Sequence, residues 1–334
     1  MDIIGKNNAL SDIEGLIIGN YTDMDAACGV TVVICKEGAV AGVDVRGSAP
    51  GTRETDLLEP LNLVDRVQAV VLSGGSVYGL SASDGVVRWL AEKGLGFPLD
   101  DQHVAPIVPA AVLFDLGRGS DFIPPINSDW GLKACLAAKD GPISTGCVGA
   151  GTAALSGSIK GGLGTAGLIL DSGITVAALV AVNSFGSVIN PATGRFWEID
   201  LEVSGEFGEQ GRRSVELPIS PDASPSKNTT IGIVATDAVL TKTQATKIAQ
   251  MAHDGMARAI RPSHTLFDGD TIFSLATGKK KLPEIPGFFV APQAQAVNEI
   301  GHVASNCMSR AIIHAILAAK SQFGMTAFRD LKDR

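Results

Sequence analysis

Cysteine is scarce in this chain and shows no pattern. The 334 residues include five cysteines, an odd number, and no two of them form a C-x-x-C pair. This spacing fits neither a disulfide framework nor a thiol redox motif, and no cysteine stands in a nucleophile motif. We therefore expect reduced, mostly buried thiols in a cytoplasmic protein. The residues are Cys28, Cys35, Cys135, Cys147 and Cys307.

Basic residues and long apolar runs are also in short supply. Lys and Arg number 27 against 35 Asp and Glu, which gives a formal net charge of −8 and an isoelectric point of about 5.2. An acidic chain is a poor partner for nucleic acid or an anionic membrane surface. The longest apolar stretch, residues 173–182, is too short to cross a bilayer. The first residues, MDIIGK, lack the basic region and long apolar run of a signal peptide, so we expect none.

Several familiar site motifs are absent or incomplete. There is no G-x-S-x-G elbow, and the histidines show no metal-binding spacing, so we predict neither a metal nor a cofactor. The D-G-D turn at 268–270 lacks the further ligands of a calcium loop. Residues 162–167 match G-x-G-x-x-G, but no convincing strand precedes them, and Val182 and Asn183 stand where the acidic residue belongs. We interpret this segment as a Gly-rich turn and the lysines at 279–281 as a solvated turn.

What the chain does contain is typical of a tightly packed α/β protein. Apolar residues make up 45% of it, and its 39 glycines allow close approaches between backbone segments. Its length suits one large domain or two ordinary ones. A capping box, Thr241-x-x-Gln244, marks the start of one helix. The patterns predict strands at 30–35, 39–45, 69–72 and 174–182, and helices at 80–93, 129–138, 242–260 and 296–320.

One junction has the character of a catalytic position. Residues 204–228 are polar and rich in Gly and Pro, which predicts an exposed connection, and an apolar strand at 230–236 follows at once. The two segments meet at Asn228-Thr229. A Thr hydroxyl is a weak nucleophile that needs a base. Cutting the bond before Thr229 frees an α-amine with a pKa of about 7.7–8.0, which is a base within the same residue.

The junction strand is one of several blocks that carry a family resemblance. The blocks are VDVRGSAPGTRETD at 43–56, LSGGSVYGL at 72–80, VAPIVPAAVLFD at 104–115, GAGT at 149–152, KGGLGT at 160–165, NTTIGIVATD at 228–237 and FDGDT at 267–271. In this order they resemble the DmpA-type aminopeptidases. That family contains L-aminopeptidase/D-esterases, β-peptidyl aminopeptidases and nylon-oligomer hydrolases, and the resemblance covers nearly the whole chain.

The resemblance implies a four-layer αββα sandwich, similar to that of N-terminal nucleophile hydrolases but with its own connectivity. It also implies a single domain, 1–334, which cuts itself into an alpha chain, 1–228, and a beta chain, 229–334. The two pieces are expected to stay together. Members are usually homo-oligomers, often tetramers or larger, so we expect the same of this chain.

The implied chemistry centres on the junction. Thr229 is expected to attack the Asn228 carbonyl during self-cleavage and a substrate amide afterwards, forming an acyl-enzyme. Asn183 matches a family residue whose side-chain amide donates to the developing oxyanion, a contribution of about 3–4 kcal/mol. Tyr78 is expected to donate to the oxyanion or to line the substrate pocket. The alternatives for these two are an Asn that turns the chain and a half-buried core Tyr.

Three charged residues complete the implied site. Lys160 matches a family lysine whose charge keeps the α-amine neutral and assists the oxyanion; a surface lysine in a turn is the alternative. Asp268 and Asp270 match the acidic pair of the nylon-oligomer branch and are expected to orient Thr229 and accept from its amine. Other branches carry Ser and Glu there, and many have a Ser nucleophile. Both differences favour the nylon-oligomer branch over a β-peptide substrate.

We therefore predict a hydrolase that releases N-terminal residues from small peptides, amides or esters. An endo-acting hydrolase of linear amide oligomers, using the same site, is the alternative within the family. Two other classes remain open: an uncut α/β protein that binds a nucleotide through its Gly-rich loops, and a non-enzymatic binding module. A chain break at residue 229 discriminates the hydrolase from both. No nucleic acid, membrane or metal partner is expected.

Overall fold

The computed structural model describes residues 3–218, 228–284 and 291–334. Its helices are α1 Ala82–Glu92, α2 Ser128–Leu136, α3 Gly208–Gly211, α4 Lys242–Ala259 and α5 Ala294–Ala318. Its strands are β1 Leu16–Asp23, β2 Cys28–Val45, β3 Gly51–Arg53, β4 Arg66–Ser73, β5 Phe97–Pro98, β6 Val104–Ala105, β7 Ala110–Val112, β8 Leu155–Ser156, β9 Ile159–Lys160, β10 Gly162–Ile169, β11 Thr175–Val182, β12 Ile189–Asn190, β13 Arg195–Phe196, β14 Ile231–Ala238 and β15 Thr271–Lys280.

The long strand β2 joins two parts of one nine-stranded sheet. The strand order is β10-β11-β14-β15-β2-β4-β7-β3, and β1 also pairs with β2. The first half of β2 pairs with β1, whereas its second half pairs with β15. The strands expected at 30–35 and 39–45 are therefore one strand, with a register shift between Ile34 and Ala39. At this shift Gly38 has a φ of 72°, a left-handed conformation that glycine adopts without strain.

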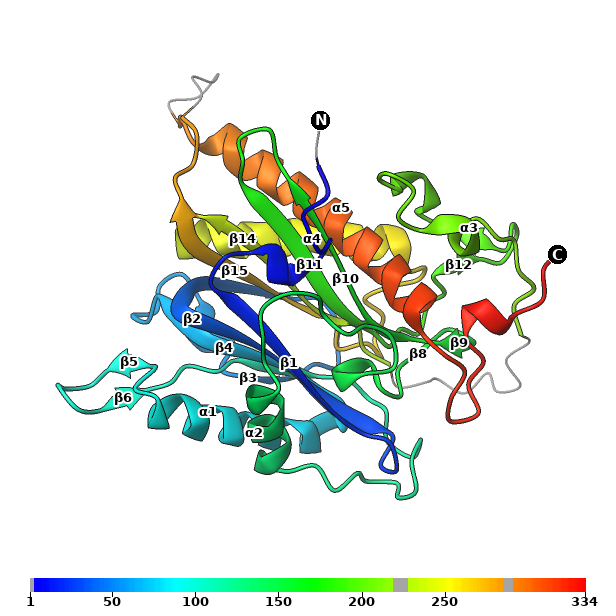
Figure 1. Ribbon diagram of the computed structural model, residues 1–334, viewed down its shortest axis with the longest axis horizontal. Helices are drawn as coiled ribbons and strands as arrows, with labels where there is room; N and C mark the ends of the chain where they lie inside the picture. Colours follow the sequence, from blue (N-terminus) through cyan, green and yellow to red (C-terminus); the bar gives the residue numbers. More distant parts are fainter. Residues whose placement is uncertain (1–2, 219–227, 285–290) are drawn as a thin grey trace.

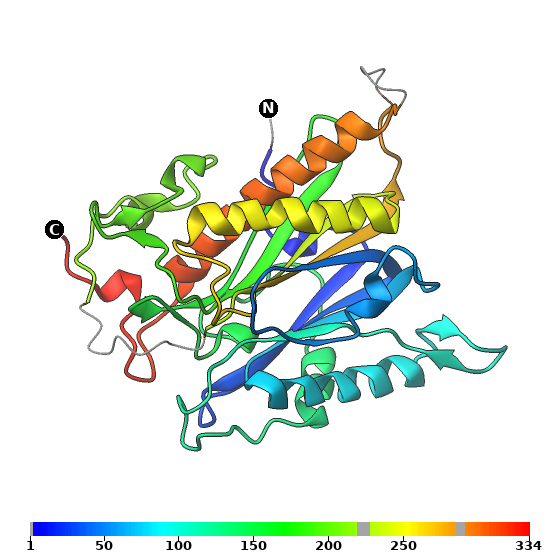
Figure 2. The same cartoon turned by 180° about the vertical axis from the view of Figure 1, so that it is seen from behind.

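Buried apolar side chains of the described residues fall into three clusters that separate four layers. One cluster lies between α4–α5 and the β10–β11–β14 part of the sheet, the second between the two parts of the sheet, and the third between β1–β2–β4 and α1–α2. Neighbouring strand residues face different clusters: Ile233 packs in the second and Val234 in the first, as side chains alternate across a strand. Figures 1 and 2 show α4 and α5 on one side of the molecule and α1 and α2 on the other. The expected αββα sandwich is confirmed.

The predicted helices are present as α1, α2, α4 and α5. The capping box at the start of α4 is formed: Thr241 Oγ1 accepts from the Gln244 N–H at 3.2 Å, and Gln244 Oε1 accepts from the Thr241 N–H at 2.9 Å. The first residue of the expected helix 80–93 differs, because Leu80 belongs to a 3-10 turn, Ser76–Ser81, that precedes α1.

The glycine-rich segment 162–167 is a strand, and its interpretation as a turn was wrong. It forms the start of β10, which pairs with β11 along its length. Helix α5 crosses this strand so closely that a Cβ atom at Gly164 would lie 2.1 Å from the carbonyl oxygen of Ala311. The glycines therefore serve helix–sheet packing rather than a phosphate loop.

The lysines at 279–281 were also misplaced, since Lys279 and Lys280 are the last residues of β15. Lys279 Nζ lies 2.6 Å from Glu37 Oε2, and Lys280 Nζ lies 2.9 Å from Asp237 Oδ2. Ion pairing at the end of a strand explains these charges better than a solvated turn.

The junction 228–229 leads directly into β14, which lies inside the sheet between β11 and β15. The strand expected at 230–236 is thus confirmed. The expected connection 204–228 contains the short helix α3, while its residues 219–227 lie outside the described part of the chain.

The described residues include all five cysteines and the helices α1 to α5. All five cysteines are free, and Cys147 is the one that is partly exposed. Within residues 3–218, 228–284 and 291–334, no helix combines the length and apolar character needed to cross a bilayer.

Candidate active site

The Thr229 hydroxyl lies against the peptide bond that precedes it. Thr229 is 5% exposed. Its Oγ1 donates to the Asn228 carbonyl oxygen at 2.6 Å and accepts from the Gly269 N–H at 3.0 Å. Its own N–H donates to the Asn183 carbonyl oxygen at 2.6 Å. Backbone groups from two other segments therefore hold the Thr229 side chain and the Asn228–Thr229 peptide bond.

The two predicted aspartates reach this place because of the sheet topology. Strands β14 and β15 are parallel neighbours, so both begin at the same edge of the sheet. The D-G-D turn precedes β15 and Thr229 precedes β14, which brings the two together. Asp270 Oδ1 accepts from the Thr230 N–H at 2.7 Å, and the N–H of Gly269 reaches Thr229. Asp270 and the backbone of Gly269 therefore hold the Thr229–Thr230 segment, whereas the Asp268 carboxylate bonds to Thr265.

Burial and charge set the protonation of Asp268. Its carboxylate is 1% exposed and accepts from the Thr265 N–H at 2.9 Å and the Thr265 hydroxyl at 2.6 Å. Burial raises the pKa of Asp268 above its ordinary value, the nearby Asp270 charge raises it further, and the bonds from Thr265 offset this only in part.

His264 is a residue of this site that sequence reasoning missed. Its Nδ1 lies 2.8 Å from Asp270 Oδ2, and its backbone N–H donates to the same oxygen at 3.0 Å. The backbone of His264 has a φ of 56°, which is uncommon for a residue other than glycine. The histidine spacing indicated no metal site, and no motif marked His264, although it lies only six residues before Asp270.

Asn183 contacts the junction through its backbone, and its side chain is fixed beside the site. Its Oδ1 accepts from Arg118 Nη1 at 2.7 Å and from the Leu155 N–H at 3.0 Å. Its Nδ2 donates to the Phe114 carbonyl oxygen at 3.0 Å. Because a guanidinium can only donate, Arg118 defines which end of the carboxamide is the oxygen. Arg118 was not predicted, since no motif distinguishes it.

Lys160 is fully buried, in place of the surface turn that was its alternative. Its Nζ donates to the carbonyl oxygens of Gly151, Ala154 and Gly161 at 3.3, 3.0 and 2.9 Å. Burial lowers the pKa of Lys160 to about 8; the neighbouring Cys147 thiol opposes this shift and the Arg118 charge adds to it.

A cavity of about 420 Å³ opens onto the junction. It is lined by Ala49, Pro50, Gly51, Ser76, Val77, Val112, Leu113, Phe114, Asn228, Thr229, Leu266 and Phe267. Tyr78 follows two of these lining residues on the 3-10 turn, but it is 45% exposed and does not itself line the cavity. The predicted roles of Tyr78 stay predictions.

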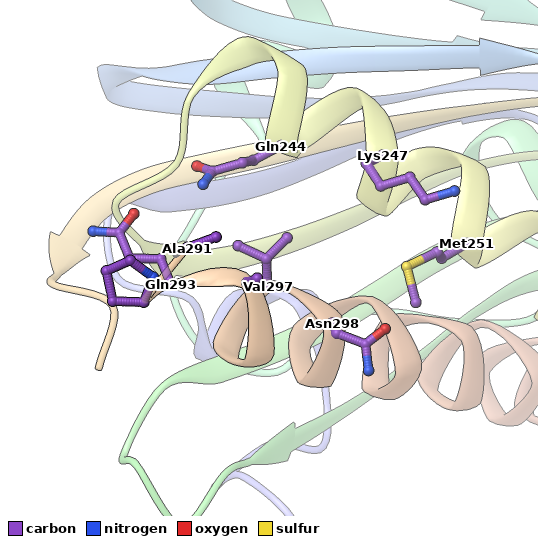
Figure 3. Close-up of a pocket in the computed structure, with 9 residues that line it drawn as sticks. Gln244, Lys247, Met251, Ala291, Gln293, Val297 and Asn298 are labelled. Atoms are coloured by element: carbon purple, nitrogen blue, oxygen red, sulfur yellow. The ribbon is translucent and has the colours of Figure 1, made fainter. Parts of the chain in front are cut away.

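A second cavity, of about 490 Å³, lies between the first turns of α4 and α5 (Figure 3). Lys247 is the one ionisable residue among those described in its lining, and Met251 and Val297 form part of its apolar wall. None of its described lining residues is a Ser, Thr or Cys. The junction cavity contains Thr229 beside a peptide carbonyl and is the candidate active site.

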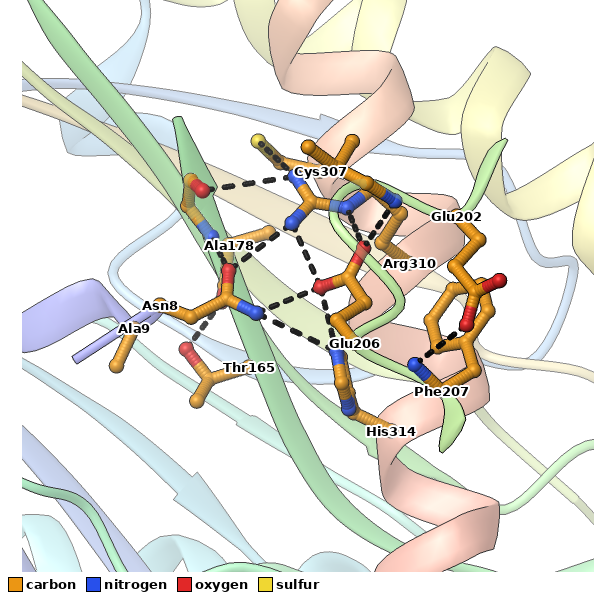
Figure 4. Close-up of polar contacts among 12 residues, drawn as sticks. Asn8, Ala9, Thr165, Ala178, Glu202, Glu206, Phe207, Cys307, Arg310 and His314 are labelled. Atoms are coloured by element: carbon orange, nitrogen blue, oxygen red, sulfur yellow. Dashed lines mark hydrogen bonds and ion pairs between the residues drawn. The ribbon is translucent and has the colours of Figure 1, made fainter. Parts of the chain in front are cut away.

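A buried ionic cluster ties the segment before the junction to α5 (Figure 4). Glu206 accepts from Arg310 Nε at 2.5 Å and Nη2 at 2.7 Å, and Asn8 Nδ2 and His314 Nε2 lie 2.6 and 2.8 Å from its Oε2. Burial by itself raises the pKa of Glu206, but the bonds from His314 and Arg310 outweigh it and lower the pKa to about 2. The connection expected to be exposed is therefore anchored at Glu206, as counter-ion to a buried arginine.

Known proteins resemble the chain along nearly its whole length. The model of a family described as peptidase family S58 matches residues 8–329. An uncharacterized aminopeptidase of Mycobacterium tuberculosis is 45% identical over 342 residues, covering 97% of this chain and 98% of that protein. A 6-aminohexanoate-oligomer endohydrolase of Kocuria sp. is 28% identical over 325 residues, covering 93% and 86%.

Solved structures share the fold. The L-aminopeptidase D-Ala-esterase/amidase of Ochrobactrum anthropi, a variant of the Ntn hydrolase fold, matches with a TM-score of 0.72 at 20% identity, covering 97% of this chain and 90% of that one. The expected resemblance and fold are thus confirmed, and so is the hydrolase class. The chain belongs to peptidase family S58.

Proposed function

We propose that this chain is a self-processing amide hydrolase whose nucleophile is Thr229. The observation that carries the proposal is the Thr229 hydroxyl, 2.6 Å from the carbonyl oxygen of the preceding peptide bond. The hydroxyl oxygen adds to the Asn228 carbonyl carbon, the C–N bond breaks, and the hydroxyl proton passes to the departing nitrogen. Water then hydrolyses the resulting ester, which leaves 1–228 with a carboxylate and 229–334 with a free α-amine.

The new α-amine then acts as the base for turnover. In the uncut chain the Thr229 nitrogen donates to the Asn183 carbonyl oxygen at 2.6 Å, and this bond would keep the amine beside its own hydroxyl. With an ordinary pKa of about 7.7–8.0, a useful fraction of the amine is neutral near pH 7. The amine accepts the hydroxyl proton while the oxygen attacks a substrate carbonyl, and water resolves the acyl-enzyme.

The remaining site residues keep the roles proposed from the sequence. Asp268 and Asp270 are proposed to orient Thr229; the bond from the Thr230 N–H to Asp270 supports this for Asp270, while the Asp268 carboxylate is held by Thr265. Asn183 Nδ2 carries a second hydrogen besides the one given to Phe114, and this is the donor proposed for the oxyanion. Tyr78 is proposed as a second donor or pocket residue, and Lys160 as the cation that favours the oxyanion.

The substrate we propose is a small peptide, amide or ester from which the N-terminal residue is released. The 45% identical aminopeptidase of M. tuberculosis supports this choice. Internal cleavage of linear amide oligomers is the second candidate, supported by the 28% identical Kocuria endohydrolase of 6-aminohexanoate oligomers. The same nucleophile serves both.

Trapping the acyl-enzyme tests the proposal. The purified protein is mixed with an amino-acid 4-nitrophenyl ester, quenched in acid within seconds and analysed by mass spectrometry. We expect the acyl mass on the piece that begins at Thr229, localised to that residue by fragmentation. An acyl group on any other residue, or its retention by the Thr229→Ala variant, contradicts the proposal.

A further inference from the structure

The carboxamide of Asn228 indicates how polar the junction cavity is. Asn228 is 1% exposed and lines the junction cavity. Among the described residues, neither its Oδ1 nor its Nδ2 has a hydrogen-bond partner. Buried carboxamides normally find partners, since leaving one unpaired is costly. The described walls around Asn228 therefore provide no hydrogen-bond partner for its side chain.

The described cavity walls are uncharged. Apart from Asn228 and Thr229 themselves, Ser76 is the only described lining residue whose side chain is polar. The apolar lining includes Val112 and Leu113 in the wall and Leu266 at the mouth, where it is 77% exposed. The nearby carboxylates of Asp268 and Asp270 are already bonded to Thr265, Thr230 and His264.

A substrate acyl group must take the position that Asn228 occupies in the uncut chain. The same Thr229 hydroxyl attacks both carbonyl carbons, so both must occupy one place relative to it. The group on the acyl side of the scissile bond, Asn228 before cleavage and substrate afterwards, then points into the same cavity. This step rests on the proposed function.

We propose that this cavity is an acyl subsite selective for uncharged, apolar side chains. An apolar group buries its surface there without losing hydrogen bonds. An amide, carboxylate or ammonium of the same size loses its water and finds no replacement. Leucine and asparagine side chains have nearly the same shape, so the pair isolates polarity from size.

Rates on matched substrates test the selectivity. We expect kcat/KM for leucine 4-nitroanilide to exceed that for asparagine 4-nitroanilide by about 30-fold, with the aspartate and lysine compounds lower still. Equal or faster hydrolysis of the asparagine, aspartate or lysine compound by the cut enzyme overturns the subsite while leaving the proposed function intact. A cut enzyme that hydrolyses none of these, nor their esters, overturns the proposed function.

Stability of an uncuttable chain gives a test that needs no turnover. In a Thr229→Ala background, Asn228→Leu removes the unpaired carboxamide and Asn228→Asp places a charge in the same cavity. We expect the melting temperature to rise by about 2–4 °C with Leu and to fall with Asp. A lower melting temperature with Leu than with Asn overturns the proposal, whatever the enzyme hydrolyses.

A change at the cavity mouth extends the test to specificity. Leu266→Glu places a carboxylate beside the subsite, and we expect it to raise the lysine-to-leucine ratio of kcat/KM at least about 10-fold. Leu61→Glu is the matched control, because Leu61 is 98% exposed and does not line the cavity. An unchanged ratio with Leu266→Glu, or an equal change with Leu61→Glu, contradicts the assignment.

Discussion

Arg118 fixes the carboxamide of Asn183, and through it the direction of the donor proposed for the oxyanion. The guanidinium bonds Asn183 Oδ1 at 2.7 Å and the Ala153 carbonyl at 2.6 Å. Replacing it with an apolar side chain leaves Leu155 as the only other described group that orients the amide oxygen. We therefore expect Arg118 to act as a positioning residue for Asn183.

We predict that Arg118→Met lowers kcat by about 10- to 100-fold with little change in KM. Arg88→Met, an exposed site on α1, is the control and is expected to change neither. A double-mutant cycle with Asn183→Ala separates positioning from a general structural effect. If Arg118 acts through Asn183, Arg118→Met should lower kcat very little in the Asn183→Ala background. Decreases in kcat that multiply independently in the double variant contradict this role.

We predict that Lys160 makes the rate of the proposed self-cleavage depend on pH. The uncut chain has no free α-amine at Thr229, so this step avoids the titration of that amine. Burial lowers the pKa of Lys160 to about 8, so the side chain is charged below that pH and neutral above it. If its charge assists cleavage, the rate falls as the pH rises through about 8. Newly translated chains shifted to buffers between about pH 6 and 10 provide the measurement. Lys160→Arg should remove the fall, and a wild-type rate that stays level or rises above pH 8 contradicts the role.

Sequence reasoning was more complete for the residues that carry out chemistry than for those that support them. Thr229, Asp268 and Asp270 stand in recognisable blocks, and the structure brings them together. Arg118 meets Asn183 because segments distant in sequence converge at the site, and a single sequence contains no signal for such a contact. His264 lies only six residues before Asp270, and what the sequence did not indicate is the turn that directs its ring toward that carboxylate.

At the scale of elements, the sequence patterns predicted helices α1, α2, α4 and α5 and strands β2, β4, β11 and β14, and the errors have physical causes. The register shift in β2 exposes two residues inside one strand, which divides its pattern into two apparent strands. The glycines of β10 suggest a turn because their real reason, the close approach of α5, is a tertiary contact. The pairing of β2 with β15 could not be predicted either, because a local apolar pattern does not indicate which strands are neighbours.

The Glu206–Arg310 pair joins an element before the junction to one after it. Arg310 is 1% exposed at its side chain and Glu206 is 5% exposed. Removing one charge from a buried pair leaves the other uncompensated, so Glu206→Gln is expected to cost about 3 kcal/mol of unfolding free energy. Urea unfolding in a Thr229→Ala background measures this on a single uncut chain. Glu209→Gln, exposed on the neighbouring helix α3, should cost almost nothing; equal midpoints for the two variants contradict the anchoring role.

At the scale of the whole molecule, the proposed cut does not divide the fold into two bodies. Strands β14 and β15 follow the junction but lie between β11 and β2, which precede it. Separating the pieces would break hydrogen-bonded ladders on both sides. We predict that 1–228 and 229–334 elute together in native size-exclusion chromatography and separate only in denaturant. Elution of either piece alone under native conditions contradicts the single-domain prediction, and the same experiment measures the predicted homo-oligomer.

The central claim is that Thr229 cuts the bond before it. Intact mass of the denatured wild-type protein, measured beside Thr229→Ala, tests this most directly. The account predicts two masses for the wild type, those of 1–228 and 229–334, and one uncut mass for the variant. A wild-type chain that stays whole while hydrolysing amino-acid amides, or a variant that is cut at the same bond, would contradict the account.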